Sequence, residues 1–115
     1  KIYGSGNQTR SYCYITDAVV GFLNVIAKGG RGEIYNIGNP KEEIDLFNLI
    51  NKFKKVVDNK IKIKRTAYPS SYPEDEPQRR CPDIRKSFRH FGFKPIVNLS
   101  EGLKRLVSHA LSKSQ

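Results

Sequence analysis

The sequence contains no Met, no Trp and only two Cys among its 115 residues. Cys13 and Cys81 stand 68 positions apart, without a C-x-x-C pair or a Cys/His cluster, which argues against a zinc site. No apolar run approaches the roughly 20 residues that span a bilayer, and no signal-peptide pattern is present at the start. We expect reduced thiols and a cytoplasmic location. We interpret a chain without Met as a piece of a longer protein.

Several motifs of catalysis are also absent. No G-x-G-x-x-G or P-loop pattern follows a strand, since Gly4 and Gly6 precede one instead. No G-x-S-x-G pattern and no metal-ligand spacing occur, and we interpret His90 and His109 as surface or edge residues. The sequence therefore predicts no catalytic residue and no metal ligand in this chain.

The charge is strongly one-sided. Lys and Arg number 21 against 11 Asp and Glu, a formal net charge of +10 at pH 7. This excess favours polyanions or anionic ligands without saying which. A basic nucleic-acid-binding or scaffold module is one alternative, supported by the charge, the lysine-rich stretch 52–65 and the tyrosines. Against it, the sequence holds no known nucleic-acid motif, and the lysines also fit a solvated face.

Periodicity predicts a mixed α/β (α+β) chain, in a single domain over residues 1–115, with about three short strands and four helices. The predicted strands are 9–15, 33–37 and 61–68. The predicted helices are 17–28 (capped by Thr16 or Asp17), 43–58, 83–91, and a last one capped by Ser100. Apolar residues cover nearly the whole circumference of helix 17–28, so we expect it to be well buried.

Arginine is the residue type left to explain. Arg10 stands where a polar, glycine-containing loop becomes a strand, and Arg79-Arg80 stand in the Pro-rich loop 69–82. Two arginines brought together from separate loops would form a diphosphate clamp, because guanidinium groups match phosphate oxygens bidentately. From spacing alone, two unrelated surface arginines remain the alternative.

Four stretches resemble the C-terminal part of the extended short-chain dehydrogenase/reductase family, the NAD-dependent nucleotide-sugar epimerases, dehydratases and decarboxylases. They are YGSGNQTRSYCYITDAVVG (3–21), IYNIGNP (34–40), EPQRRCPDIRKSFRHFGFKP (76–95) and NLSEGL (98–103). They occur in the family's order and spacing and cover almost the whole chain. The Q-T-R-S and R-x-P-D-I forms look most like the UDP-glucuronate decarboxylase branch.

The resemblance implies a role for five residues. Arg10, in Q-T-R, would bind the nucleotide diphosphate, Asn36, in Y-N-I-G, would hydrogen-bond the same phosphates, and Arg80, in R-x-P-D, would clamp them from the other side. Tyr3, in Y-G, would lie near the base. Asp83 would orient the arginine loop or cap the following helix. The residues alone suggest Arg10 and Arg80, whereas Asn36 is reached only through the resemblance.

The resemblance also implies what this chain lacks. In the family, the N-terminal Rossmann half carries the NAD loop and a Tyr-x-x-x-Lys catalytic pair, and neither pattern occurs here. We therefore expect the parent enzyme to bind NAD and a UDP- or dTDP-sugar, to act as a lyase or isomerase, and to form a homodimer. The isolated chain would bind no NAD and would be inactive. Its partner would be its own Rossmann half, with no membrane and no nucleic acid involved.

Overall fold

A computed structural model describes residues 2–57, 62–71 and 77–113. Its strands are β1 (Ile2–Tyr3), β2 (Thr9–Ser11), β3 (Glu43–Asp45), β4 (Arg65–Thr66) and β5 (Arg79–Arg80). Its helices are α1 (Ile15–Lys28), α2 (Leu46–Val56), α3 (Arg85–Phe91) and α4 (Leu99–Ser112), with a 3₁₀ turn, η1 (Pro40–Glu42). The chain is thus a mixed α/β structure, as the sequence predicts. The acidic residues 74–76 lie outside the described ranges.

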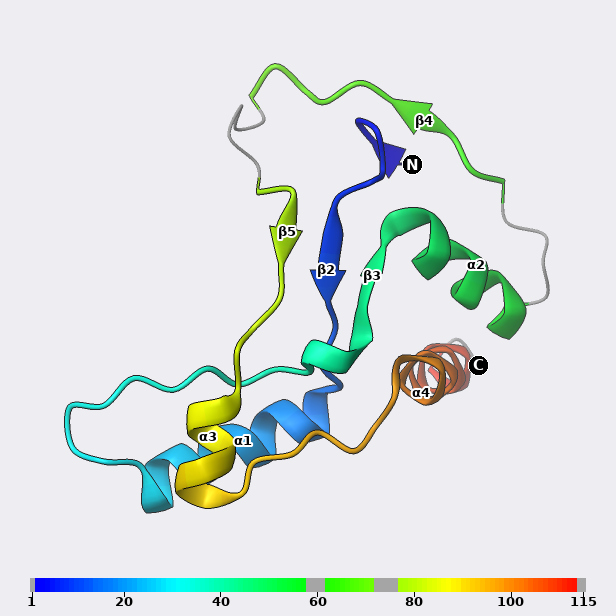
Figure 1. The fold of residues 1–115 in the computed structure, drawn as a ribbon. Helices are drawn as coiled ribbons and strands as arrows, with labels where there is room; N and C mark the ends of the chain where they lie inside the picture. The colour runs from blue at the N-terminus through cyan, green and yellow to red at the C-terminus, as the bar shows by residue number, and fades with distance from the viewer. Residues whose placement is uncertain (1, 58–61, 72–76, 114–115) are drawn as a thin grey trace.

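A three-stranded sheet in the order β3-β2-β5 organises the molecule (Figure 1). Strand β2 runs antiparallel to β3 and parallel to β5, with Thr9 opposite Arg79 and Arg10 opposite Arg80. A separate parallel pair joins β1 to β4. The two parallel strands β2 and β5 therefore end at the same edge of the sheet.

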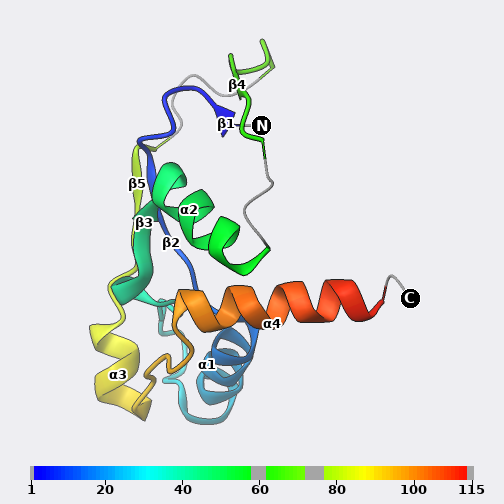
Figure 2. The same ribbon diagram turned by 90° about the vertical axis from the view of Figure 1, so that its right-hand side faces the viewer.

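The helices lie in two groups around this sheet. Helices α2 and α4 pack together on one side of it, while α1 and α3 lie side by side beyond the end where β2 and β5 finish (Figures 1 and 2). The chain passes from β2 into α1 and from β5 into α3 through short connections. Strands β2 and β5 carry Arg10 and Arg80, and Asp83 lies in the connection from β5 to α3.

Helix α1 begins two residues earlier than predicted, and its predicted cap is wrong. Its N-cap residue is Tyr14, which makes no side-chain capping bond. Asp17 is instead buried, and its Oδ2 accepts the backbone N–H groups of Ile96 (3.1 Å) and Val97 (2.9 Å). The carboxylate therefore ties the segment before α4 to α1, a contact between residues some 80 positions apart.

The prediction that this helix is well buried is also wrong. Six large apolar side chains of α1 are exposed: Ile15, Val19, Val20, Phe22, Leu23 and Ile26, the last at 82%. The close contact is made around Gly21, where an added Cβ would lie 2.4 Å from Cγ2 of Ile37 and 2.9 Å from the Phe93 ring. One side of α1 thus packs within the chain, while a wide apolar face does not.

Three other predicted elements differ from the structure. Residues 43–45 form strand β3 rather than the first turn of a helix, because their backbone pairs with β2 and Asp45 caps α2 by accepting the Asn48 N–H at 2.8 Å. The cap of α4 is Asn98, which accepts the Glu101 N–H at 2.9 Å, and not Ser100. Of the predicted strand 61–68, only Arg65–Thr66 pairs, and Ile61 lies outside the described residues.

The remaining differences concern strands whose existence depends on a neighbour. Residues 33–37 form no strand in the structure. Conversely, Arg79–Arg80 form one inside the predicted Pro-rich loop, because β2 offers its free edge to them. The strand 9–15 is shorter than predicted, since pairing stops at Ser11.

The hydrophobic core of the described chain is small. The buried apolar side chains among the described residues are Ile2, Phe93, Val97 and Leu99. The radius of gyration is 16.8 Å, whereas a compact domain of this length has about 13 Å. The fold is therefore open, and some faces of its helices are not covered by other elements of the chain.

Candidate functional site

An open hollow lies where the parallel strands β2 and β5 end, the edge at which ligands bind in parallel sheets. We call it the arginine hollow. Three short segments line it, one following β2, one preceding η1 and one running from β5 towards α3. Its residues are Ser11, Cys13, Asn36, Ile37, Gly38, Arg79, Arg80, Cys81, Pro82 and Asp83. It therefore collects Asn36, Arg80 and Asp83 from the residues expected to bind substrate.

Arg10 lies beside Arg80 although it does not line the hollow. The two residues are register partners on adjacent parallel strands, so their side chains leave the same face of the sheet. The Arg10 guanidinium donates from Nη1 to the carbonyl oxygen of Thr9 at 2.8 Å. The pairing brings together two cationic side chains that are about 70 positions apart in sequence, at the rim of the hollow.

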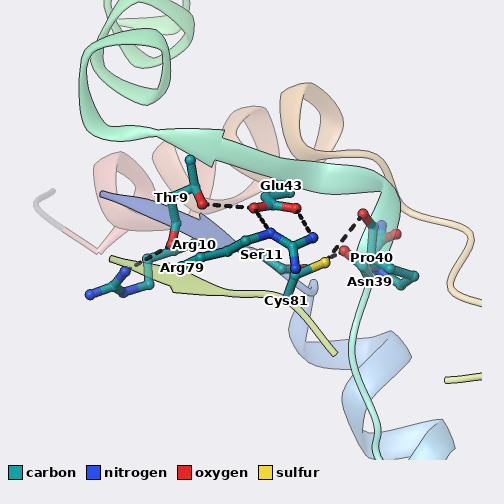
Figure 3. A network of polar contacts seen from close by, with 8 residues as sticks. All are labelled: Thr9, Arg10, Ser11, Asn39, Pro40, Glu43, Arg79 and Cys81. Atoms are coloured by element: carbon teal, nitrogen blue, oxygen red, sulfur yellow. Dashed lines mark hydrogen bonds and ion pairs between the residues drawn. The ribbon is translucent and has the colours of Figure 1, made fainter. Parts of the chain in front are cut away.

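The Arg79 side chain leaves the opposite face of the sheet and bonds to Glu43 (Figure 3). Its Nε and Nη2 donate to the two carboxylate oxygens of Glu43 at 2.8 and 2.7 Å. The Thr9 hydroxyl donates to the same carboxylate at 2.7 Å. Arg79, followed by Thr9, lowers the pKa of Glu43 to about 2, so this carboxylate is ionised at neutral pH.

Asn36 and Asp83 face each other across the hollow. The Asn36 side-chain amide donates to the backbone carbonyl of Asp83 at 3.1 Å. The Asp83 carboxylate accepts the Arg85 N–H at 2.9 Å and the Arg85 guanidinium at 2.6 to 3.0 Å, which lowers its pKa to about 2. Asp83 therefore bonds to the first residue of α3, where it satisfies a backbone group that the helix leaves unpaired.

Gly38 allows the two walls of the hollow to approach. A Cβ added at Gly38 would lie 2.6 Å from Cγ of Pro82, closer than packed atoms come. Ser87 holds the same wall from beneath, because its buried hydroxyl donates to the Asn36 carbonyl at 2.5 Å. The segment that carries Asn36 is thus held by Ser87 of α3 and packs against Pro82 at Gly38.

Tyr3 lies apart from the arginine hollow, on β1. Its half-exposed ring stacks on Tyr68 with centroids 6.2 Å apart and planes inclined at 20°. The Tyr68 hydroxyl accepts a hydrogen bond from the Gln8 side-chain amide at 3.2 Å. The structure thus gives Tyr3 an aromatic partner that the sequence reasoning missed, and it does not bring Tyr3 into the lining of the hollow.

Sequence reasoning also missed Ser11, Cys13 and Glu43. Ser11 donates its hydroxyl to the carbonyl of Asn39, and burial raises the pKa of the Cys13 thiol. The sequence predicted that Glu43 begins helix 43–58, and no sequence pattern indicated that it lies in a strand. Residues 43–45 form a strand because their backbone pairs with β2, which only the fold reveals.

Within the described ranges, no group of three or more His, Cys, Asp or Glu side chains is placed to hold a metal ion. In the same ranges, no helix has the length and apolar character needed to cross a membrane. The glycines with positive φ nearest the sheet, Gly4 (+65°) and Gly6 (+76°), precede strand β2 and not a helix. Neither of these two glycines therefore forms the glycine-rich helix start that holds a dinucleotide phosphate.

A sequence model described as the NAD dependent epimerase/dehydratase family matches residues 1–38. UDP-glucuronic acid decarboxylase 1 of Danio rerio is 32% identical over 108 residues, which are 94% of this chain and 24% of that protein. UDP-glucuronic acid decarboxylase 3 of Arabidopsis thaliana is 38% identical over 98 residues, which are 85% of this chain and 27% of that protein.

The chain is related to the C-terminal part of extended short-chain dehydrogenases/reductases. The resemblance predicted from the sequence is thus confirmed. Solved structures of this family share the fold. UDP-glucuronic acid 4-epimerase from Bacillus cereus, in complex with UDP-glucuronic acid and NAD, superposes with a TM-score of 0.81 at 27% identity, over 97% of this chain and 35% of that one.

A second structure of the family extends the fold comparison. UDP-glucose 4-epimerase from Thermotoga maritima, solved with UDP-glucose, gives a TM-score of 0.87 at 24% identity, over 99% of this chain and 35% of that one. The predicted mixed α/β class is therefore confirmed as that of a C-terminal short-chain dehydrogenase/reductase portion. The chain spans about a quarter of the length of these decarboxylases and a third of that of these epimerases.

Proposed function

We propose that this chain supplies the nucleotide-sugar-binding part of an NAD-dependent epimerase, dehydratase or decarboxylase, and that Arg10, Asn36 and Arg80 hold the diphosphate. The observation that carries the proposal is the register pairing of Arg10 with Arg80 at the end of two parallel strands. Asn36 and Arg80 line the hollow beside that pair. Two guanidinium groups and an amide offer donors and charge of the kind that phosphate oxygens accept.

The reaction itself belongs to the rest of the parent enzyme in this proposal. NAD would be held there and would supply hydride transfer at the sugar, while this chain contributes contacts to the nucleotide. Contacts remote from the reacting carbon orient the substrate and help to lower the barrier. The isolated chain would accordingly bind a UDP- or dTDP-sugar without turning it over. A homodimeric parent and a cytoplasmic location stay predictions.

The partner proposed for this chain is the Rossmann half of the same enzyme. Two features support it. The α1 face is apolar yet exposed, with Val20 at 53% and Ile26 at 82%, and Ile34 nearby in sequence is exposed at 83%. Residues 33–37 have a strand-like sequence but form no strand within the described chain. A sheet edge and an apolar layer from a second α/β unit would satisfy both features.

The experiment that tests the clamp is a proton–nitrogen NMR titration of this chain with UDP, followed by uridine and pyrophosphate alone. We expect resonances of Arg10, Asn36 and Arg80 to shift with UDP and pyrophosphate but hardly with uridine. Arg80→Ala should weaken UDP binding about tenfold or more, because a charge-assisted hydrogen bond is lost. Arg31→Ala, in an exposed turn outside the hollow, removes the same charge and is the matched control.

Two results would contradict the proposal. One is a titration to excess UDP in which the three resonances do not move. The other is an Arg31→Ala variant that loses as much affinity as Arg80→Ala, since long-range charge alone would then explain binding. Shifts confined to the α2 lysines would favour the nucleic-acid alternative instead.

A further inference from the structure

Strand β5 presents Arg80, yet it is only two residues long and exposed. Its described backbone contacts are the parallel pairing with β2 and a bond from the Thr9 N–H to the Gln78 carbonyl at 2.8 Å. Two-residue strands have little intrinsic preference for one register, and sliding by one residue moves every side chain to the other face. The placement of Arg80 beside Arg10 therefore requires something that fixes β5.

The Glu43 carboxylate supplies such a connection. It lies on β3, and in the order β3-β2-β5 it is not a neighbour of β5. It nevertheless reaches Arg79 across the middle strand, with both carboxylate oxygens engaged, at 2.8 and 2.7 Å. Thr9, which stands between them on β2, donates to the same carboxylate at 2.7 Å (Figure 3). One carboxylate thus bonds to side chains from both other strands.

The geometry selects one register for β5. Arg79 and Arg80 are consecutive in a strand, so they leave opposite faces of the sheet. While Arg79 is bound to Glu43 on one face, Arg80 must emerge on the other, which is the face of Arg10. A two-point fork between guanidinium and carboxylate also fixes direction as well as distance.

We propose that Glu43 is a positioning residue for the diphosphate clamp: by binding Arg79 across β2, it fixes the register of β5 and so presents Arg80 beside Arg10. This inference rests on the proposed function, since the group that it positions is the proposed phosphate ligand. Glu43 itself does not contact the ligand. The Arg79 side chain is 68% exposed, so the effect is expected on local geometry more than on global stability.

The test measures UDP binding and strand register in the same 115-residue chain. Glu43→Gln should weaken UDP binding by about tenfold and weaken the nuclear Overhauser contacts between the Arg10 and Arg80 backbones. Glu42→Gln, at the neighbouring position, removes the same charge without touching Arg79 and should leave both unchanged. Exchanging the partners, with Glu43→Arg and Arg79→Glu together, should restore the contacts and most of the affinity.

The outcomes separate this inference from the proposed function. If the unmodified chain binds UDP and Glu43→Gln binds it equally well, the positioning role is wrong and the clamp stands. If the variant only melts at a lower temperature while its folded form keeps full affinity, Glu43 is merely structural and the inference is again wrong. If neither the unmodified chain nor any variant binds UDP, the proposed clamp is wrong, and so is the positioning role of Glu43.

Discussion

Arg79 and Arg80 are neighbours in the chain with different surroundings, because a strand directs consecutive side chains to opposite faces. Both line the hollow, but Arg79 bonds to Glu43, whereas Arg80 lies beside Arg10. Their chemistry is identical, and only their position relative to β2 distinguishes them. Replacing either arginine with Lys keeps the charge but removes the planar, two-point donor group of the guanidinium. Lysine is therefore not an equivalent residue at position 79 or 80.

Acid should remove the contribution of Glu43 to stability. Its pKa is lowered from the ordinary 4.5 to about 2 in the folded chain. A lowered folded-state pKa stabilises the fold above the ordinary value, and the contribution is lost as pH falls towards the folded value. We expect the difference in free energy of unfolding between the unmodified chain and Glu43→Gln to be constant above about pH 5 and to vanish towards pH ~2.

Urea unfolding at several pH values measures this difference. Glu42→Gln reports the effect of removing one charge at the adjacent position. A gap between the unmodified chain and Glu43→Gln that stays the same down to the most acidic condition would show that the Arg79 pair does not stabilise the fold.

At the scale of elements, the start of α4 gives a matched pair of residues. Asn98 accepts the Glu101 N–H at 2.9 Å, while the hydroxyl oxygen of Ser100, inside the helix, accepts a hydrogen bond from Nζ of Lys52 at 3.4 Å. Asn98→Ala should lower the free energy of unfolding by about 1 kcal/mol, since a helix N–H loses its partner. Ser100→Ala should change it by less than about 0.5 kcal/mol. Equal losses from the two variants would contradict this assignment of the cap.

Elements with internal signals could be predicted from the sequence. The four α-helices were all expected, because apolar periodicity and helix ends are local properties. Their caps were harder to predict. Thr16, Asp17 and Ser100 all have capping side chains, but Asp17 is bound to the Ile96 and Val97 N–H groups from a distant segment. Sequence alone does not reveal such a competing partner.

Strands were predicted less well because a strand needs a neighbour. The apolar alternation in 33–37 predicted a strand, and no partner for it exists within the described chain. Arg79–Arg80 gave no strand signal and form one because β2 has a free edge. Of the candidate site, Arg10 and Arg80 followed from charge chemistry and Asn36 from the resemblance. Glu43 followed from neither, because its partners come from two other strands.

At the scale of the whole molecule, the fold is open and the apolar face of α1 is exposed. Val20→Lys or Ile26→Lys on that face should change the free energy of unfolding of this chain by less than about 0.5 kcal/mol, because both side chains are already exposed. Gly21→Ala on the same helix should destabilise it clearly, since its Cβ would lie 2.4 Å from Ile37. Thermal unfolding of the three variants measures the contrast.

The same lysine substitutions, made in the longer protein, test whether the proposed Rossmann half covers α1. If the Rossmann half covers α1, a lysine at position 20 or 26 places a charge in an apolar contact and should destabilise that protein strongly. Lysine variants that melt together with the unmodified longer protein would exclude α1 as the covered face.

The pairing of β5 with β2 has a mechanical consequence. It joins residues about 70 positions apart, and closing so long a loop carries an entropic cost that grows with the logarithm of its length. A diphosphate held between Arg10 and Arg80 would act there as a removable cross-link, in the way that a disulfide does permanently. The nucleotide would then be part of the tertiary structure, and a chain emptied of it would be easier for a protease to open.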